Sequence, residues 1–259
     1  MRIATYNING VNGRLDILLK WLKKARPDVV CLQELKCADD KFPLHAINKA
    51  GYQAIWHGQK SWNGVAILSR IGEPVEVRRT LPGDPKDLHS RYIEAIINNQ
   101  FLIAAIYLPN GNPWPSEKFD YKLQWFKRLI KHSKALVKHD VPVLLVGDFN
   151  VMPEEIDVYN PESWKDNALF RTEVRKAFKS LLATGWTDAI RSLYPDQRLY
   201  TFWKYYHHAF AKDLGLRIDH FLVSKHFKNK LIKAGVDKSV RALPGSSDHA
   251  PVWLEVNDK

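Results

Sequence analysis

The chain has 259 residues with 45% hydrophobic content, which is enough for one large domain with a substantial core. Its 39 Lys and Arg residues outnumber the 28 Asp and Glu residues, and the resulting net charge of +11 favours a polyanionic partner, most commonly nucleic acid. No apolar stretch approaches the roughly 18 residues that a membrane-spanning helix needs, so we expect no segment that spans a bilayer in this way.

A membrane surface is the other partner that such a charge attracts. The sequence contains neither a long, strongly basic amphipathic helix nor a lipidation signal, and its first residues, MRIATYNING, are typical of a strand instead of a signal peptide. Cys31 and Cys37 have five residues between them and no nearby Cys or His partners, which argues against a zinc site. Cys31 is expected to be a small buried hydrophobe. Two cysteines without a disulfide framework suit a reducing cytosol.

Short apolar runs, rich in Val, Ile and aromatic residues, end abruptly in polar residues and predict strands. In chain order they cover residues 2–6, 28–32, 63–68, 101–107, 141–146 and 217–223. Leucines at helical spacing predict a helix over 15–25, and Ser116 can cap a longer helix that reaches residue 138. Because no linker or repeat interrupts this mixture, we predict a layered α/β sandwich in one domain, residues 1–259.

The helix that follows Ser116 has two contrasting faces. Its apolar stripe runs from Phe119 to Val137. We assign the basic residues of the segment to the opposite face and expect them to be solvated: Lys122, Lys127, Arg128, Lys131, Lys134 and Lys138. A solvated face of this kind needs no ligand to explain it.

Polar side chains recur at or near the ends of the predicted strands, at Asn7, Glu34, Tyr107, Asp148, Asn150 and Asp219. Asp148 and Asn150 are two residues apart, so in extended backbone they face the same side. A carboxylate at the tip of a fully apolar strand is desolvated unless it is paired, metal-bound or wet. The other interpretation of GDFN is a turn in which Asp and Asn bond their own backbone, and the tetrapeptide alone does not decide between the two.

Asp248 and His249 come just before a last strand-like run, in GSSDHAPVW. On a regular strand neighbouring side chains point to opposite faces, so both groups reach one site only if they lie on a turn. Gly245, two serines and Pro251 favour such a turn. The alternative is that the pair is only the polar end of the strand.

The motifs TYNING, LQE, IYLPNGN, GDFN, GLRIDHFLVS and SDHAPV occur in this order between about residues 2 and 256. Together they resemble the exonuclease III family of abasic-site (AP) endonucleases, within the DNase I-like endonuclease/exonuclease/phosphatase superfamily. The resemblance implies an α/β (α+β) fold of four αββα layers. Two mixed, mainly antiparallel sheets would pack face to face with helices outside, and the site would lie at one edge where the sheets meet.

The resemblance also implies a divalent metal, normally Mg²⁺ with Mn²⁺ as a substitute. Glu34 would be its principal ligand, Asn7 would help to hold it, and Asp248 would act close by. Asp148 and Asn150 complete this oxygen-rich set, which suits a hard cation that keeps several waters.

Three further roles follow from the same resemblance. Asp148 would accept a proton from the attacking water, which Asn150 would orient, while Tyr107 would donate its hydroxyl to the phosphate or the leaving oxygen. His249 would contact a phosphate oxygen, and Asp219 would hold its other ring nitrogen and favour the imidazolium. Whether Asp148 or His249 is the general base stays open.

Each site residue also has a plain structural interpretation. Glu34 can be a surface acid, Tyr107 a core aromatic, Asn7 a turn former, and Asp219 an ion-pair partner of Arg217. The ordered set of motifs favours a site over these separate explanations. One position departs from some family members, which have an acid where this chain has Asn9.

For the substrate, the resemblance implies duplex DNA with abasic sites or blocked 3′ ends. Residues matching Phe202, Leu216 and Ile218 would wall a small apolar pocket for a flipped, base-free sugar. The expected activities are AP endonuclease cleavage 5′ to the lesion, 3′→5′ exodeoxyribonuclease, and 3′-phosphatase or 3′-phosphodiesterase, all in base excision repair. We expect a monomer in the bacterial cytoplasm, without a nucleotide cofactor or a membrane partner.

Alternative functions stay open at this point. One is a 3′-end-processing enzyme with little internal abasic-site incision, and another is a phosphoesterase of the same fold that acts on a non-DNA substrate. A third is a non-catalytic DNA-binding module, against which stands the complete set of acids and amides. The segment Ala168-Leu169-Phe170 and the stiff loop PNGNPWPSEK are the places where the sequence leaves the balance of activities undecided.

Overall fold

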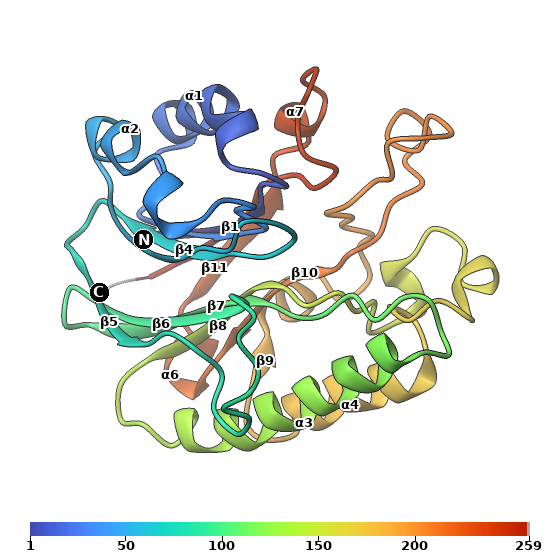
Figure 1. Cartoon of the computed structure of the whole chain (residues 1–259). Coiled ribbons are helices and arrows are strands. Elements are labelled where there is room, and N and C mark those ends of the chain that lie inside the picture. The colour runs from blue at the N-terminus through green and yellow to red at the C-terminus, as the bar shows by residue number, and fades with distance from the viewer. Residues whose placement is uncertain (258–259) are drawn as a thin grey trace.

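A computed structural model describes residues 1–257 as two six-stranded sheets with helices around them (Figure 1). The first sheet has the order β11 (Leu231–Val236), β12 (Val252–Val256), β1 (Arg2–Asn7), β2 (Val29–Gln33), β4 (Val65–Ser69) and β3 (Gln53–His57). The second has the order β5 (Pro74–Arg78), β6 (Tyr92–Ile97), β7 (Phe101–Tyr107), β8 (Val143–Asp148), β10 (Asp219–Val223) and β9 (Thr187–Asp188).

Each sheet contains one parallel pair, β1 with β2 and β7 with β8, and its other described pairs are antiparallel. The sheets pack face to face, because one core cluster contains Ile3 and Cys31 of the first sheet together with Ile103 and Val146 of the second. The next residue along β1, Ala4, faces the opposite way and packs in the cluster under the helices. Both faces of the central strands are therefore buried.

Helices cover the two outer faces (Figure 1). On the first sheet these are α1 (Leu15–Ala25) and α2 (Leu44–Lys49), and on the second α3 (Glu117–Leu136) and α4 (Thr172–Leu182). Short helices lie elsewhere along the chain: α5 (Ala189–Leu193), α6 (Lys225–Lys228) and α7 (Lys238–Arg241). The predicted four-layer αββα sandwich is confirmed. Within residues 1–257, no helix combines the length and apolar character needed to cross a membrane.

The predicted strands match β1, β2, β4, β7, β8 and β10 to within two residues at each end. The predicted helix over 15–25 is α1, and the Ser116 side chain caps α3 by accepting a hydrogen bond from the Phe119 N–H. Both cysteines are free and buried, as expected for Cys31.

The solvated basic face assigned to the α3 segment is wrong at one position. Lys127, Lys131 and two further lysines are exposed, but Lys122 has no exposed surface. Lys122 follows Phe119 by three residues and precedes Phe126 by four, so helical geometry places it on the buried face. Arg128 is half-buried and pairs with Asp87 at 2.6 Å.

Candidate active site

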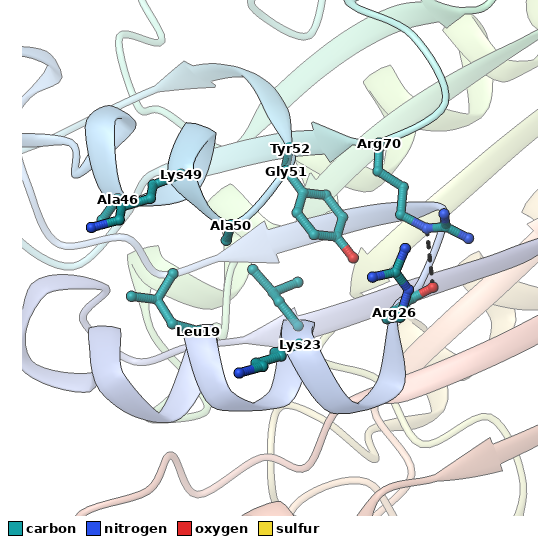
Figure 2. Close-up of a pocket in the computed structure, with 10 residues that line it drawn as sticks. Leu19, Lys23, Arg26, Ala46, Lys49, Ala50, Gly51, Tyr52 and Arg70 are labelled. Carbon is teal, nitrogen blue, oxygen red and sulfur yellow. Dashed lines mark hydrogen bonds between the residues drawn. The ribbon is translucent and has the colours of Figure 1, made fainter.

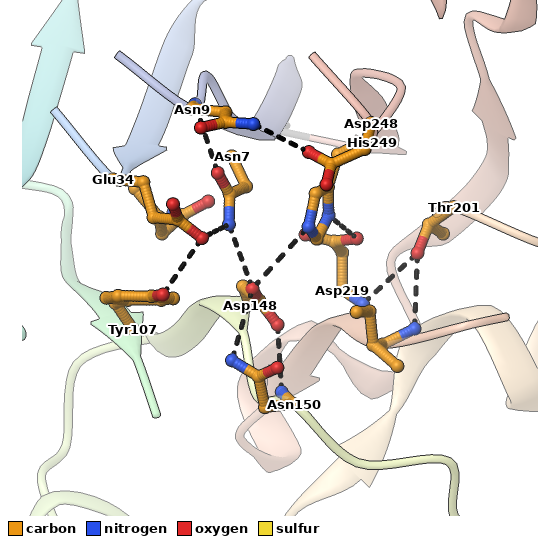
Figure 3. Close-up of polar contacts among 12 residues, drawn as sticks. Asn7, Asn9, Glu34, Tyr107, Asp148, Asn150, Thr201, Asp219, Asp248 and His249 are labelled. Atoms are coloured by element: carbon orange, nitrogen blue, oxygen red, sulfur yellow. Dashed lines mark hydrogen bonds and ion pairs between the residues drawn. The ribbon is translucent and has the colours of Figure 1, made fainter. Parts of the chain in front are cut away.

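Strand register brings the predicted polar residues to a single edge of the sandwich (Figure 3). In the first sheet Asn7 pairs with Gln33, which places Glu34 just beyond the edge. In the second sheet Asp148 ends β8, opposite both Tyr107 of β7 and Asp219 of β10. Because both parallel pairs end at this edge, five separate segments deliver polar side chains to one place.

The side chain of Asn7 joins the two sheets at this edge. Its amide nitrogen donates to Glu34 Oε1 at 2.8 Å and to Asp148 Oδ2 at 3.0 Å (Figure 3). Glu34 also accepts from the Tyr107 hydroxyl at 2.8 Å, and Lys36 Nζ lies 2.9 Å from Glu34 Oε2. Burial would raise the pKa of Glu34, but the bond from Asn7 and the charge of Lys36 outweigh it and hold that pKa below its usual value. Glu34 is therefore a carboxylate at neutral pH.

His249 stands between two acids. Its Nδ1 lies 2.9 Å from Asp219 Oδ2, and its Nε2 lies 3.7 Å from Asp148 Oδ2. Burial would lower the pKa of the imidazole, but the charge and hydrogen bond of Asp219, aided by Asp148, raise it well above its usual value. Thr201 Oγ1 accepts from the Asp219 backbone N–H at 3.3 Å and helps to fix this support. His249 is therefore a buried imidazolium that Asp219 holds through Nδ1.

Asp148 and Asn150 form a local turn and also face the site. Asp148 Oδ1 accepts from the Asn150 backbone N–H at 2.8 Å, and the Asn150 side chain donates to Leu108 O at 2.9 Å. Burial raises the pKa of Asp148, and the negative Asp219 adds to it, while the charge of His249 opposes both. The turn interpretation of GDFN is confirmed, and the same turn places the Asp148 carboxylate at the shared edge.

Gly147 makes this strand end possible. A Cβ atom at this position would lie 2.0 Å from Ile106 O of the paired strand, and its φ of 149° favours glycine. Asp148 follows directly, so any side chain at residue 147 would displace it.

The pair Asp248-His249 lies on a turn before β12, as the sequence favours. Ser247 Oγ donates to Asn7 O at 2.6 Å and accepts from the His249 N–H at 3.2 Å, which pins the turn to β1. Asp248 Oδ1 accepts from Asn9 Nδ2 at 3.1 Å, and Lys36 Nζ donates to Asn9 Oδ1 at 2.6 Å. The neutral amide of Asn9 thus links Asp248 to the cation beside Glu34.

The donor set fits a divalent cation. Carboxylate oxygens are hard ligands, the kind that Mg²⁺ and Mn²⁺ prefer, and Glu34, Asp148 and Asp248 supply them. The amide nitrogens of Asn7 and Asn150 face these carboxylates, so each amide would have to rotate to offer its oxygen to a cation. In the described part of the chain, Asp148, Asp219 and His249 have potential ligand atoms within 4.8 Å of one another. A protonated His249 cannot ligate a metal, so the Glu34 side of the edge is the better place for one. Asp219 Oδ1 is buried and, within residues 1–257, accepts no hydrogen bond.

An apolar wall lies beside the imidazolium. Phe202, Leu216 and Ile218 pack in one cluster, and the rings of Phe202 and His249 are 5.0 Å apart at 66°. Single bridges pair the backbone of Phe202 with both Leu216 and His249. Leu169, from the segment that the sequence left undecided, is a buried member of the same cluster. The structure thus brings together the three residues that were predicted to wall the sugar pocket.

Arg217 points away from this wall into a buried ion cluster. Its Nε lies 2.7 Å from Asp157 Oδ1, and its Nη1 lies 2.8 Å from Asp188 Oδ2. The suggested ion pair between Arg217 and Asp219 is therefore wrong, since Asp219 bonds His249 instead. Successive residues of an extended segment face opposite sides, which separates the wall from its charged anchor.

Lys122 ties two site loops together and was missed at the sequence level. Its ammonium donates to Asn110 O at 3.0 Å and to Asn150 O at 2.6 Å. Burial lowers the pKa of Lys122 to about 7, with the charge of Asp148 opposing the shift. Asn110 Nδ2 in turn donates to Asn150 Oδ1 at 3.0 Å. The position of Lys122 within the apolar stripe of the helix was the feature of the sequence that could have predicted its burial.

The loop after β7 lines a cavity of about 480 Å³, and Tyr107 forms part of the wall of this cavity. Arg91 and Lys118 line it, and the Arg91 guanidinium lies 4.8 Å from the centre of the Tyr107 ring. Trp114 is half-buried under Arg171, whose guanidinium carbon lies 3.6 Å from the ring centre. This contact packs the Trp114 ring against Arg171 of the same chain.

An αββα sandwich with carboxylates, amides and an imidazolium at one sheet edge defines the class of DNase I-like phosphoesterases. The chain matches the Endonuclease/Exonuclease/phosphatase family over residues 4–249. It is 33% identical over 266 residues to exodeoxyribonuclease III of Haemophilus influenzae, with 98% of this chain and 99% of the relative covered.

Solved structures show the same likeness. An AP endonuclease from Archaeoglobus fulgidus has a TM-score of 0.95 and 36% identity, with 99% of each chain covered. The 3′ phosphatase NExo from Neisseria, bound to a product DNA hairpin, has a TM-score of 0.94 and 39% identity, again with 99% of each chain covered. The chain therefore belongs to the Endonuclease/Exonuclease/phosphatase family and is an enzyme of the exonuclease III and AP endonuclease type.

Replacing Arg217 by Met should lower the free energy of unfolding by about 3–5 kcal/mol, because the buried Asp188 loses its arginine partner and the buried Asp157 keeps only Arg191. Urea unfolding at neutral pH measures the loss, with the exposed Arg198→Met as a control within about 0.5 kcal/mol of wild type. Burial would raise the pKa of Asp157 and of Asp188, but Arg217 holds both below their usual values. The difference from wild type should shrink in acid, where the carboxyls protonate. A loss under 1 kcal/mol would contradict the cluster's role.

Replacing Lys122 by Met should lower nuclease turnover at least about tenfold, with a smaller change in KM, because Asn150 loses the ammonium that holds its carbonyl. The unfolding free energy should fall by about 1–3 kcal/mol, the cost of leaving buried carbonyls unbonded. Lys127→Met, on the exposed face of the same helix, is the matched control. Equal turnover in the two variants would show that Lys122 does not position the site.

Proposed function

We propose that the protein is a Mg²⁺-dependent DNA repair phosphodiesterase that cuts duplex DNA 5′ to abasic sites. The same site would also act as a 3′→5′ exodeoxyribonuclease and as a 3′-phosphatase or 3′-phosphodiesterase. The observation that carries this proposal is the single edge where Asn7 bonds Glu34 and Asp148 beside the His249 imidazolium. The similarity to exodeoxyribonuclease III and to an AP endonuclease supports it.

Glu34 would be the principal metal ligand, with Asn7 and Asp248 beside it and the oxygens of Asp148 and Asn150 within the same network. A bound divalent cation neutralises charge that develops on the phosphoryl oxygens. Lys36 would keep Glu34 ionised and ready to bind the cation. Tyr107, whose hydroxyl now donates to Glu34, would turn to donate to the phosphate or the leaving oxygen.

Asp148 would take a proton from the attacking water, and Asn150 would orient that water. A raised pKa suits a general base that works near neutral pH. His249 would clamp a non-bridging phosphate oxygen through its Nε2–H, while Asp219 holds its Nδ1–H. A fixed imidazolium stabilises the charge of the transition state better than that of the ground state, because its geometry is set before reaction.

The apolar wall would select the lesion. Phe202, Leu216 and Ile218 offer a surface for a base-free sugar, and an abasic nucleotide is cheap to extrude because it has little stacking to lose. The net charge of +11 supports binding to many phosphates. Arg91 and Lys118 of the cavity next to Tyr107 would contact the backbone beside the cut.

A 3′-end-processing enzyme with little internal incision is the second candidate. The 39% identity to the Neisseria 3′ phosphatase favours it. We further infer a single catalytic domain, residues 1–259, that works as a monomer in the bacterial cytoplasm. One core shared by both sheets supports the single domain.

Incubation with a duplex that carries one abasic-site analogue and Mg²⁺ should give incision 5′ to the analogue that EDTA abolishes. Asp148→Asn should reduce this rate at least about 100-fold, because the general base is lost. A duplex with a 3′-phosphate, under the same conditions, distinguishes the two candidates. Release of the 3′-phosphate without internal incision would leave only the second, and unchanged activity in Asp148→Asn would refute the base assignment.

The pH dependence of kcat/KM separates the roles of Asp148 and His249. Because the His249 cation lowers the pKa of Asp148, His249→Gln should raise that pKa and move the acidic limb to higher pH. The base must be deprotonated, so a higher pKa demands a higher pH for the same rate. If His249 were the base, the acidic limb would instead disappear in His249→Gln.

A further inference from the structure

A concave pocket of about 580 Å³ lies between α1 and α2 on the outer side of the first sheet (Figure 2). This volume is in the range of ligand-binding pockets. Its floor is apolar, with Leu19 and Leu22 from α1, Ala46 from α2 and the buried ring of Tyr52. The site described above uses none of these residues.

Strand register places the pocket at the edge of the sheet opposite the catalytic one. Ser69 pairs with Val29 at the far end of β4 from Val65, and Arg70 follows directly. Arg26, at the end of α1, lies at the same far edge, since Arg70 Nε donates to Arg26 O at 3.2 Å. The 11 residues of α1 span about 16 Å, so DNA held at the catalytic edge lies at the other end of this helix.

Four basic side chains surround the mouth of the pocket: Lys23, Arg26, Lys49 and Arg70 (Figure 2). Asp28 forms an ion pair with Arg70 at 2.5 Å. Within residues 1–257, the side chains of Lys23, Arg26 and Lys49 make no hydrogen bond or ion pair. The rim therefore presents cationic side chains that are free to pair with the anionic groups of a ligand.

Helix dipoles explain only part of this charge. Lys23 lies in the last turn of α1 and Lys49 in that of α2, where cations offset the negative helix ends. Each helix end carries a partial charge of roughly −0.5, so the two ends together offset about one cation. Asp28 offsets another, which leaves about two positive charges over an apolar floor.

We propose that this pocket binds a partner protein through a short acidic segment in which carboxylates flank one large apolar side chain. The apolar side chain would cover Leu19, Leu22 and Tyr52, while the carboxylates would pair with the basic rim. A nucleic-acid backbone would satisfy the cations but leave the floor exposed to water, so the combination favours a peptide. The inference does not depend on the proposed nuclease activity, because it concerns the opposite edge of the sheet.

The test measures fluorescence anisotropy of a labelled peptide with one phenylalanine between two pairs of glutamates in a Gly-Ser background. The full chain should bind this peptide saturably, and the double variant Arg26→Glu/Lys49→Glu should weaken binding at least about tenfold. The matched control Lys176→Glu/Lys179→Glu makes the same change in net charge on exposed positions of α4. It should stay within about twofold of wild type, because screening limits charges at that distance.

Two further arms decide between ligands. A peptide with serine in place of phenylalanine should bind at least about fivefold more weakly, since the floor is then unused. Equal weakening by both double variants, or equal binding of both peptides, would overturn the proposal and indicate general charge attraction. A single-stranded oligonucleotide is added as a competitor. If it displaces the peptide, and if its own affinity falls only in Arg26→Glu/Lys49→Glu, the pocket is instead a nucleic-acid surface.

Folding and activity controls keep the result interpretable. Circular dichroism should show both double variants folded, because all four changed side chains are exposed. Lys23→Glu alone is the fallback variant and should weaken the peptide by a smaller factor in the same direction. Nuclease activity should be equal in the two double variants, so loss of peptide binding and failure of the nuclease assignment are separate outcomes.

Discussion

The Asn7 amide joins the two sheets at the edge where the site lies, because it donates to Glu34 of the first sheet and to Asp148 of the second. Two carboxylates brought together in a buried place repel each other, and each is costly without a partner. A neutral donor between them, with Lys36 behind one and His249 beside the other, makes the arrangement stable. The proposed metal site and base both depend on this contact between the sheets, and the Tyr107 hydroxyl bond to Glu34 is a second contact of the same kind.

The short segment Leu216–Asp219 shows how one stretch of chain serves several purposes. Leu216 and Ile218 face the apolar wall, Arg217 enters a buried ion cluster with Asp157 and Asp188, and Asp219 supports His249. The alternation of an extended backbone separates these roles. The apolar wall and the buried ion cluster therefore lie on opposite sides of the same short segment.

Local patterns predicted much of the fold but missed several strands, among them β5 at a sheet edge and its neighbour β6. The runs that became β2, β7 and β8 are apolar throughout, because central strands are buried on both faces. Strand β5 is exposed over most of its length and β6 contains the charged Glu94, so neither has such a pattern. Glu94 is tolerated because Tyr92 and His132 bond it, and His132 comes from a helix far along the chain.

The sequence by itself determined six of the strands, the helices α1 and α3, the polar residues at the strand ends and the turn that carries Asp248 and His249. These depend on propensity, alternation and turn chemistry within a few residues. Only the tertiary structure decided which side chains meet: Asn7 with Asp148, 141 residues apart, Asp219 with His249, and Lys122 with the carbonyl of Asn150. Such contacts depend on the path of the whole chain, and burial then sets the pKa values that give these groups their chemistry.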